Sequence, residues 1–168
     1  MMGCDFHCSY CQNWVTSQAL RDDAAQTQII PVTPAQLLGA ARNHHARLVV
    51  SSYNEPLITA EWAVAVFQQA REVGLDCAFV SNGNATPEVL DFLKPWIIGY
   101  KIDLKGFDET RYRRLGGTLH HVTEAIRMVH ERGIWIEIVT LLITGFNDEP
   151  QEIRAAAKFL ASVSRDIP

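Results

Sequence analysis

Hydrophobic and polar residues follow one another along most of the chain in blocks that predict strands and helices in turn. Short apolar runs predict strands at 48–52, 77–80, 97–104 and 135–143. Apolar residues at helical spacing, together with start and stop signals, predict helices at 34–43, 59–73, from 87 onwards, and at 109–114, 119–131 and 149–162. Repeated strand–helix units favour parallel strands joined by right-handed crossovers.

Residues at the predicted helix ends support these boundaries. Thr33 precedes Pro34 and Thr86 precedes Pro87, the order expected of an N-cap followed by the first helical residue. Gly74 suits the end of the helix before the second strand. The pattern predicts the α/β class, and both an open doubly wound sheet and a partial α/β barrel satisfy it.

Composition narrows the classes of function. The chain has 168 residues, of which 48% are hydrophobic and 20% charged, values that suit one globular domain with a core. Its formal net charge is −4 and it has no run of Lys or Arg, which argues against nucleic acid or an anionic membrane as the main partner. No apolar stretch approaches the ~20 residues that span a bilayer, and no secretory signal is visible, so we expect a cytoplasmic protein.

Three of the four cysteines are clustered near the start of the chain. Cys4, Cys8 and Cys11 have the spacing C-x3-C-x2-C, whereas Cys77 lies alone in an apolar run and is expected in the core. A thiol cluster in a cytosolic chain binds metal more often than it forms disulfides. Three thiolates can hold three irons of a four-iron cluster and leave the fourth open to a small molecule. His7 could instead complete a tetrahedral zinc site, and unrelated buried thiols are a third interpretation.

Small polar groups follow the predicted strands at their carboxyl ends. They are Asn54 and Glu55; Ser81, Asn82 and Gly83; Asp103 and Lys105; and Thr144, Gly145, Asn147 and Asp148. Ligands bind at this edge of a parallel sheet. Ordinary turn chemistry accounts well for Asn147 and Asp148. It accounts less well for Glu55, a carboxylate that needs a partner, and for Asp103 and Lys105, which strand alternation places on one side.

Other polar and aromatic residues carry weaker signals. Glu137 lies inside a predicted strand and would face a polar barrel interior. The pairs at 44–45 and 120–121 are histidines at helix positions, where solvent exposure is the simpler expectation. Core or rim packing is the simplest role for the tryptophans at 62, 96 and 135.

With Tyr10 before its last cysteine, the cysteine motif resembles that of the radical S-adenosylmethionine (SAM) superfamily. Further motifs follow in the family's order: Gln12-Asn13-Trp14, Tyr53-Asn54-Glu55-Pro56, Ser81-Asn82-Gly83, Asp103-Leu104-Lys105-Gly106-Phe107 and Ile143-Thr144-Gly145-Phe146-Asn147-Asp148. Together they resemble the pyruvate formate-lyase activating enzyme type, and most of all the related enzyme of the AmmeMemoRadiSam group. The resemblance runs from Gly3 to the end of the chain.

This resemblance implies a partial (β/α) barrel of about four parallel core strands with helices outside. It implies a [4Fe-4S] cluster on Cys4, Cys8 and Cys11, with SAM on the open iron. The implied cofactor-binding residues are Tyr10, Asn54, Glu55, Ser81, Asn82, Asp103 and Lys105. In this scheme Tyr10 lies near the adenine and Glu55 accepts from the SAM amino group. Ser81 and Asn82 lie beside the cofactor, and Asp103 and Lys105 reach the ribose and the methionine carboxylate.

The implied reaction is reductive cleavage of SAM to a 5′-deoxyadenosyl radical, which abstracts hydrogen from a substrate. A reductant such as flavodoxin or ferredoxin and, for a glycyl-radical-activating type, a protein substrate are the implied partners. We expect a single, incomplete radical SAM domain over 1–168, with the cluster-binding loop at 3–14. Its open sheet edges would favour a homodimer. A non-catalytic metal-binding fragment and a structural zinc protein are the alternatives.

Overall fold

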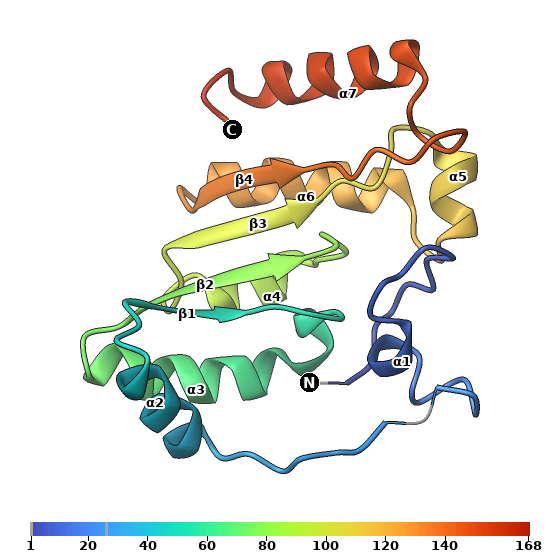
Figure 1. Cartoon of the computed structure of the whole chain (residues 1–168). Coiled ribbons are helices and arrows are strands. Elements are labelled where there is room, and N and C mark those ends of the chain that lie inside the picture. Colours follow the sequence, from blue (N-terminus) through green and yellow to red (C-terminus); the bar gives the residue numbers. More distant parts are fainter. Residues whose placement is uncertain (1, 26) are drawn as a thin grey trace.

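The fold is built on one parallel sheet, seen here in a computed structural model that describes residues 2–25 and 27–168. In the described part of the chain the sheet has four strands in the order β1-β2-β3-β4. They are β1 (Leu48–Ser51), β2 (Asp76–Ser81), β3 (Gly99–Asp103) and β4 (Trp135–Val139). All pairs are parallel, so the carboxyl ends lie at one edge (Figure 1). The predicted α/β class and strand number are confirmed.

Helices cover one face of this sheet and both of its sides. They are α1 (Trp14–Ser17), α2 (Pro34–Asn43), the 3-10 turn η1 (Pro56–Thr59), α3 (Ala60–Glu72), α4 (Pro87–Leu93), α5 (Glu109–Arg114), α6 (Leu119–Glu131) and α7 (Pro150–Val163). Helices α4 and α6 lie behind the strands, α3 lies below β1, and α7 lies beyond β4 (Figure 1). Among the described residues, no helix is both long enough and apolar enough to cross a membrane.

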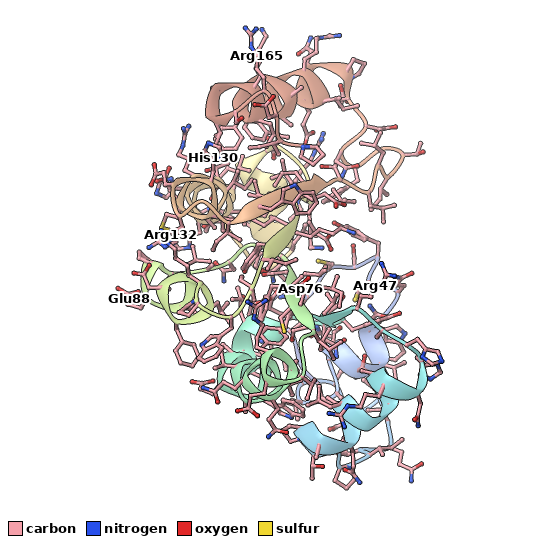
Figure 2. The ribbon with its side chains drawn as sticks, turned by 90° about the vertical axis from the view of Figure 1, so that its left-hand side faces the viewer. Arg47, Asp76, Glu88, His130, Arg132 and Arg165 are labelled. Atoms are coloured by element: carbon pink, nitrogen blue, oxygen red, sulfur yellow. The ribbon has the colours of Figure 1, made fainter. Side chains whose placement is uncertain are left out.

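The core lies between the sheet and helices α3, α4 and α6. Strand alternation points Phe79, Tyr100 and Ile136 to the same side, where each is buried at consecutive strand positions. Cys77 shares that face and is fully buried, which confirms its predicted place in the core. The layer is closed at its surface by Arg132, the residue that follows α6 (Figure 2). Its guanidinium binds Asp91 of α4 at 2.7 Å.

The opposite face of the sheet is open in the described structure. A cavity of about 300 Å³ lies there. Val80, Lys101 and Glu137 line it from three neighbouring strands, so Glu137 does face the concave side. Trp135 is 57% exposed on this face and covers Gly99, where an added Cβ would come within 3.2 Å of its ring. The surroundings of Glu137 are therefore largely apolar rather than polar.

The predicted end of the fourth strand is wrong. Strand β4 ends at Val139, short of the predicted end at 143, because backbone groups beyond it bind a side chain instead of a strand. Asn147 accepts from the N–H of Ile143 at 2.7 Å and donates to the carbonyl of Leu141 at 2.8 Å. Helix α1 has no counterpart among the predicted helices, since four residues give too short a periodic signal.

The remaining side-chain expectations agree with the structure. The histidines at 44, 45, 120 and 121 are exposed. Trp62 and Trp96 are half-buried and pack against the core.

Replacing Phe79 with Ala is expected to lower the free energy of unfolding by about 3–5 kcal/mol, because its buried ring packs against Phe67 and Tyr100. Urea denaturation of the apo-protein measures this change. Phe92→Ala is the matched control, since Phe92 is 44% exposed, and it should change the free energy much less. Equal losses in the two variants would contradict the assigned core.

Candidate cluster and cofactor site

The cysteine loop lies beyond the carboxyl ends of the strands (Figure 1). Cys4, Cys8 and Cys11 are free thiols and all three are half-buried. The N–H of Cys11 donates to the carbonyl of Cys8 at 3.1 Å, which folds the second half of the loop into a turn. Helix α1 follows at once, and its buried Ser17 places a hydroxyl 3.5 Å from the Cys11 sulfur.

The loop supplies the three cysteine sulfurs that an iron–sulfur cluster needs. Burial raises the pKa of Cys4 to about 12 and also raises that of Cys8, where the positive charge of Lys105 opposes the shift. Iron binds thiolates, so loading would displace these protons. No three His, Cys, Asp or Glu side chains in the described ranges already converge at metal-binding distance. Binding would therefore require the cysteine side chains to turn toward a common centre.

His7 does not support the zinc alternative. Its side chain is exposed and packs on Gly116, where an added Cβ would lie 2.5 Å from the ring Nδ1. The N–H of His7 donates to the carbonyl of Leu115 at 2.8 Å, which fixes this part of the loop against the turn between α5 and α6. The side chain is thus directed to that turn and adds no fourth ligand to the described thiols.

Neighbouring Phe6 is buried against the same turn. Its ring lies so close to Gly117 that an added Cβ would come within 2.1 Å of it. The edge of the Phe6 ring also meets Tyr112 of α5, with centroids 6.2 Å apart. A residue without a side chain at position 117 is therefore required for the loop to approach.

Glu55 is the most deeply buried charged residue among those predicted for the site. It is 1% exposed, and its carboxylate accepts three hydrogen bonds. The donors are the Leu57 N–H at 3.0 Å, the Ser81 hydroxyl at 2.8 Å and the Asn82 N–H at 2.7 Å. Burial raises the pKa of Glu55 to about 7, and these hydrogen bonds oppose the shift. The structure thus joins the predicted residues of two strand ends through one carboxylate.

Asn54 connects the end of β1 to the cluster loop. Tyr53 and Asn54 both have left-handed backbone angles, φ 66° and 57°, which turn the chain sharply after the strand. The side-chain oxygen of Asn54 accepts from the Thr16 hydroxyl at 2.9 Å. The N–H of Glu55 donates to the carbonyl of Gly3 at 3.3 Å, just before the first cysteine.

Asp103 and Lys105 lie together after β3, as the alternation predicted. The Lys105 ammonium is 3.6 Å from the Asp103 carboxylate, and the lysine side chain is only 19% exposed. The N–H of Lys105 donates to the Tyr112 hydroxyl at 3.0 Å, so the backbone of this strand end is fixed by α5. A half-buried ammonium that influences the Cys8 thiol is suited to bind an anionic group beside the loop.

Tyr10 extends the site to the end of β4. Its ring meets that of Phe146 edge to face, with centroids 5.5 Å apart. Phe146 lies in the motif at 143–148, but the family resemblance did not assign it to the site. Asn147, read as a turn residue, is 2% exposed and donates to the carbonyl of Lys105 at 3.0 Å. The aromatic contact and this amide join the fourth strand end to the others.

A sequence profile described as the Radical SAM superfamily matches residues 1–160. The chain belongs to the radical SAM superfamily. Members of this superfamily use a [4Fe-4S] cluster and SAM, so both predicted cofactors are confirmed at the level of the family.

Similarity to individual proteins extends this result. A domain of a pyruvate-formate lyase-activating enzyme from Bacteroides vulgatus is 27% identical, with a TM-score of 0.63, over 68% of this chain and 71% of that one. An uncharacterized protein of Methanocaldococcus jannaschii is 27% identical over 99% of this chain and 49% of its own length. The isethionate sulfite-lyase activating enzyme of Oleidesulfovibrio alaskensis is 25% identical over 68% of this chain and 38% of its own length.

Similarity of fold alone reaches further. SuiB of Streptococcus suis, solved with bound S-adenosylmethionine, has a TM-score of 0.73 at 14% identity, over 96% of this chain and 36% of that one. The chain spans about half or less of the length of the curated relatives that it matches. The predicted partial barrel is confirmed by these neighbours.

Replacing Glu55 with Ala is expected to destabilise the apo-protein by at least about 1–3 kcal/mol, because buried N–H donors lose their acceptor. Thermal or urea unfolding measures the loss. Glu61→Ala, at an exposed position of α3, is the matched control and should be close to neutral. Unchanged stability in the Glu55 variant would contradict its role as a buried acceptor.

Replacing Gly117 with Ala is expected to cost about 1–3 kcal/mol, since the new methyl group would overlap the Phe6 ring. Gly39→Ala is the control. Gly39 lies within α2 with nothing within 4 Å of an added Cβ, so that variant should gain about 0.5–1 kcal/mol. A Gly117 variant as stable as its control would show that the loop does not need this contact.

Proposed function

We propose that this chain is the core of a radical SAM enzyme, with a [4Fe-4S] cluster on Cys4, Cys8 and Cys11. When bound, the cluster supplies one electron to SAM, whose cleavage to methionine and a 5′-deoxyadenosyl radical allows hydrogen abstraction from a substrate. The observation that carries the proposal is the position of the loop, which places three free, half-buried thiols beyond the carboxyl ends of the four parallel strands. Family membership supports it.

The residues at the strand ends suit the chemical groups of SAM. The Lys105 ammonium matches the methionine carboxylate, and Asp103 beside it matches ribose hydroxyls. The aromatic pair of Tyr10 and Phe146 offers apolar surface to the adenine. Glu55 already accepts three hydrogen bonds, and a carboxylate has about four acceptor sites, which leaves one for the SAM amino group.

The neighbours make a glycyl-radical-activating role the first candidate for the substrate class. Two of them are named as activating enzymes, at 27% and 25% identity. In that role a small electron-transfer protein such as flavodoxin or ferredoxin reduces the cluster, and a partner protein gives up the hydrogen. A reducing cytoplasm suits such a cluster, because it keeps the ligating cysteines from forming disulfides.

The proposal has two rivals in the same site. A non-catalytic metal-binding fragment would hold iron without cleaving SAM, and a structural zinc protein would hold zinc instead of iron. A homodimer through the sheet edges remains a proposal. One edge is already contacted, since the N–H of Ile138 in β4 donates to the carbonyl of Pro168 at 3.0 Å.

Anaerobic reconstitution of the chain with iron and sulfide tests the function. We expect the absorbance and the reduced-state electron paramagnetic resonance (EPR) signal of a [4Fe-4S] cluster, and 5′-deoxyadenosine from SAM after reduction with dithionite. Iron binding without SAM cleavage would favour the non-catalytic fragment. Zinc binding without iron would favour the structural zinc protein.

Cys8→Ala is expected to abolish the cluster signal, because two remaining thiolates of the loop cannot hold the same set of irons. Iron and sulfide analysis measures the loss. Cys77→Ala removes a thiol from the core instead and should retain the cluster, which makes it the matched control. A Cys8 variant that loads as fully as the Cys77 variant would overturn the assigned ligand set.

A further inference from the structure

Asp5 lies inside the cysteine loop, directly after Cys4, and no motif assigned it a role. Its two carboxylate oxygens are held separately. The side-chain amide of Asn82 donates to one at 2.7 Å, and that of Asn84 donates to the other at 2.7 Å. These contacts join residues 77 and 79 positions apart in the chain. They tie this half of the loop to the end of β2.

The two amides are themselves fixed in orientation. The N–H of Asn84 donates to the side-chain oxygen of Asn82 at 2.9 Å, so the NH₂ group of Asn82 must face Asp5. The backbone N–H of Asn82 is bound to Glu55, and the residue is 4% exposed. Asp5 thus receives a rigid pair of donors whose position is set by the buried carboxylate of the neighbouring strand.

The held carboxylate also lies against the first cysteine. The Cys4 sulfur is 3.8 Å from the same Asp5 oxygen that Asn82 holds. With iron bound, this sulfur would carry negative charge beside a second negative group. A nearby anion disfavours the addition of an electron to a cluster, so charge at this position affects the reduction potential.

We propose that Asp5 is a positioning residue of the cluster. Its carboxylate, clamped by Asn82 and Asn84, fixes the first half of the loop and keeps a negative charge beside the Cys4 ligand. This inference rests on the proposed function, because it assumes a cluster on the loop. Partners that orient ligands in this way typically change metal affinity by about 10- to 100-fold when they are replaced.

An exchange of charge between positions 5 and 84 tests the clamp. Asn84→Asp brings two carboxylates together at a hydrogen-bond distance and should lower iron affinity by about 10- to 100-fold. Adding Asp5→Asn to that variant restores a donor and an acceptor at each contact, and loading should return. Asn43→Asp adds the same charge at an exposed position of α2 and should load like the wild type.

The single variant Asp5→Asn separates charge from position. Rotation of the Asn84 amide can restore both hydrogen bonds, so the cluster should load almost as in the wild type. Its midpoint potential, measured by EPR-monitored redox titration, should shift to more positive values. A midpoint potential equal to that of the wild type would overturn the electrostatic part of the proposal.

The apo-protein supplies a readout that does not depend on iron. Amide hydrogen exchange over 3–8 should be faster in Asn84→Asp and should return to the wild-type rate in the double variant. Equal exchange and equal loading in all variants would overturn the clamp, whereas a wild type that never takes up iron and sulfide would overturn the proposed function instead. Circular dichroism of each variant verifies that the fold is retained.

Discussion

The buried carboxylate of Glu55 is the interaction on which the site depends. A charge 1% exposed is tolerated only where donors compensate for lost water, and here three donors do so. They belong to the turn after β1 and to the end of β2, so the carboxylate fixes the carboxyl ends of these two strands relative to each other. Asn82, bound through its N–H, then holds Asp5 through its side chain. The order of the cluster loop therefore follows from a carboxylate that does not belong to it.

The elements of the sheet could be predicted because their signals are local. Apolar runs gave the four strands, and Thr-Pro pairs gave the starts of α2 and α4, where the threonine hydroxyls do cap the helices. The convergence of polar groups could be predicted because parallel strands bring their carboxyl ends to one edge. The end of β4 could not, because Asn147 competes for the backbone at 141 and 143 from several residues away.

The contacts that hold the loop were hidden for the same reason. The pairing of Asp5 with Asn82 and Asn84 spans more than 70 residues, and nothing in a single sequence records it. Gly117 carries no signal beyond its neighbour Gly116, although Phe6 requires its lack of a side chain. Asp5 was visible as a charged residue within a metal-binding motif. A search for charged residues between the predicted metal ligands would have identified it as a candidate.

The charges around the loop explain why Lys105 affects the cysteine thiols. Burial is the main cause of the raised pKa of Cys4 and of Cys8; the negative charges of Asp5 and Glu55 add to it at Cys4, and that of Asp5 adds to it at Cys8. Lys105 opposes this at Cys8, and it is held near the loop by Asp103 and by its backbone bond to Tyr112. The first cysteine thus lies on the acidic side of the site and the second on the basic side. In the proposed site, an anionic group of the cofactor would be drawn toward Lys105 and an ammonium toward Glu55, so the same charges that affect the thiols would also orient a zwitterion.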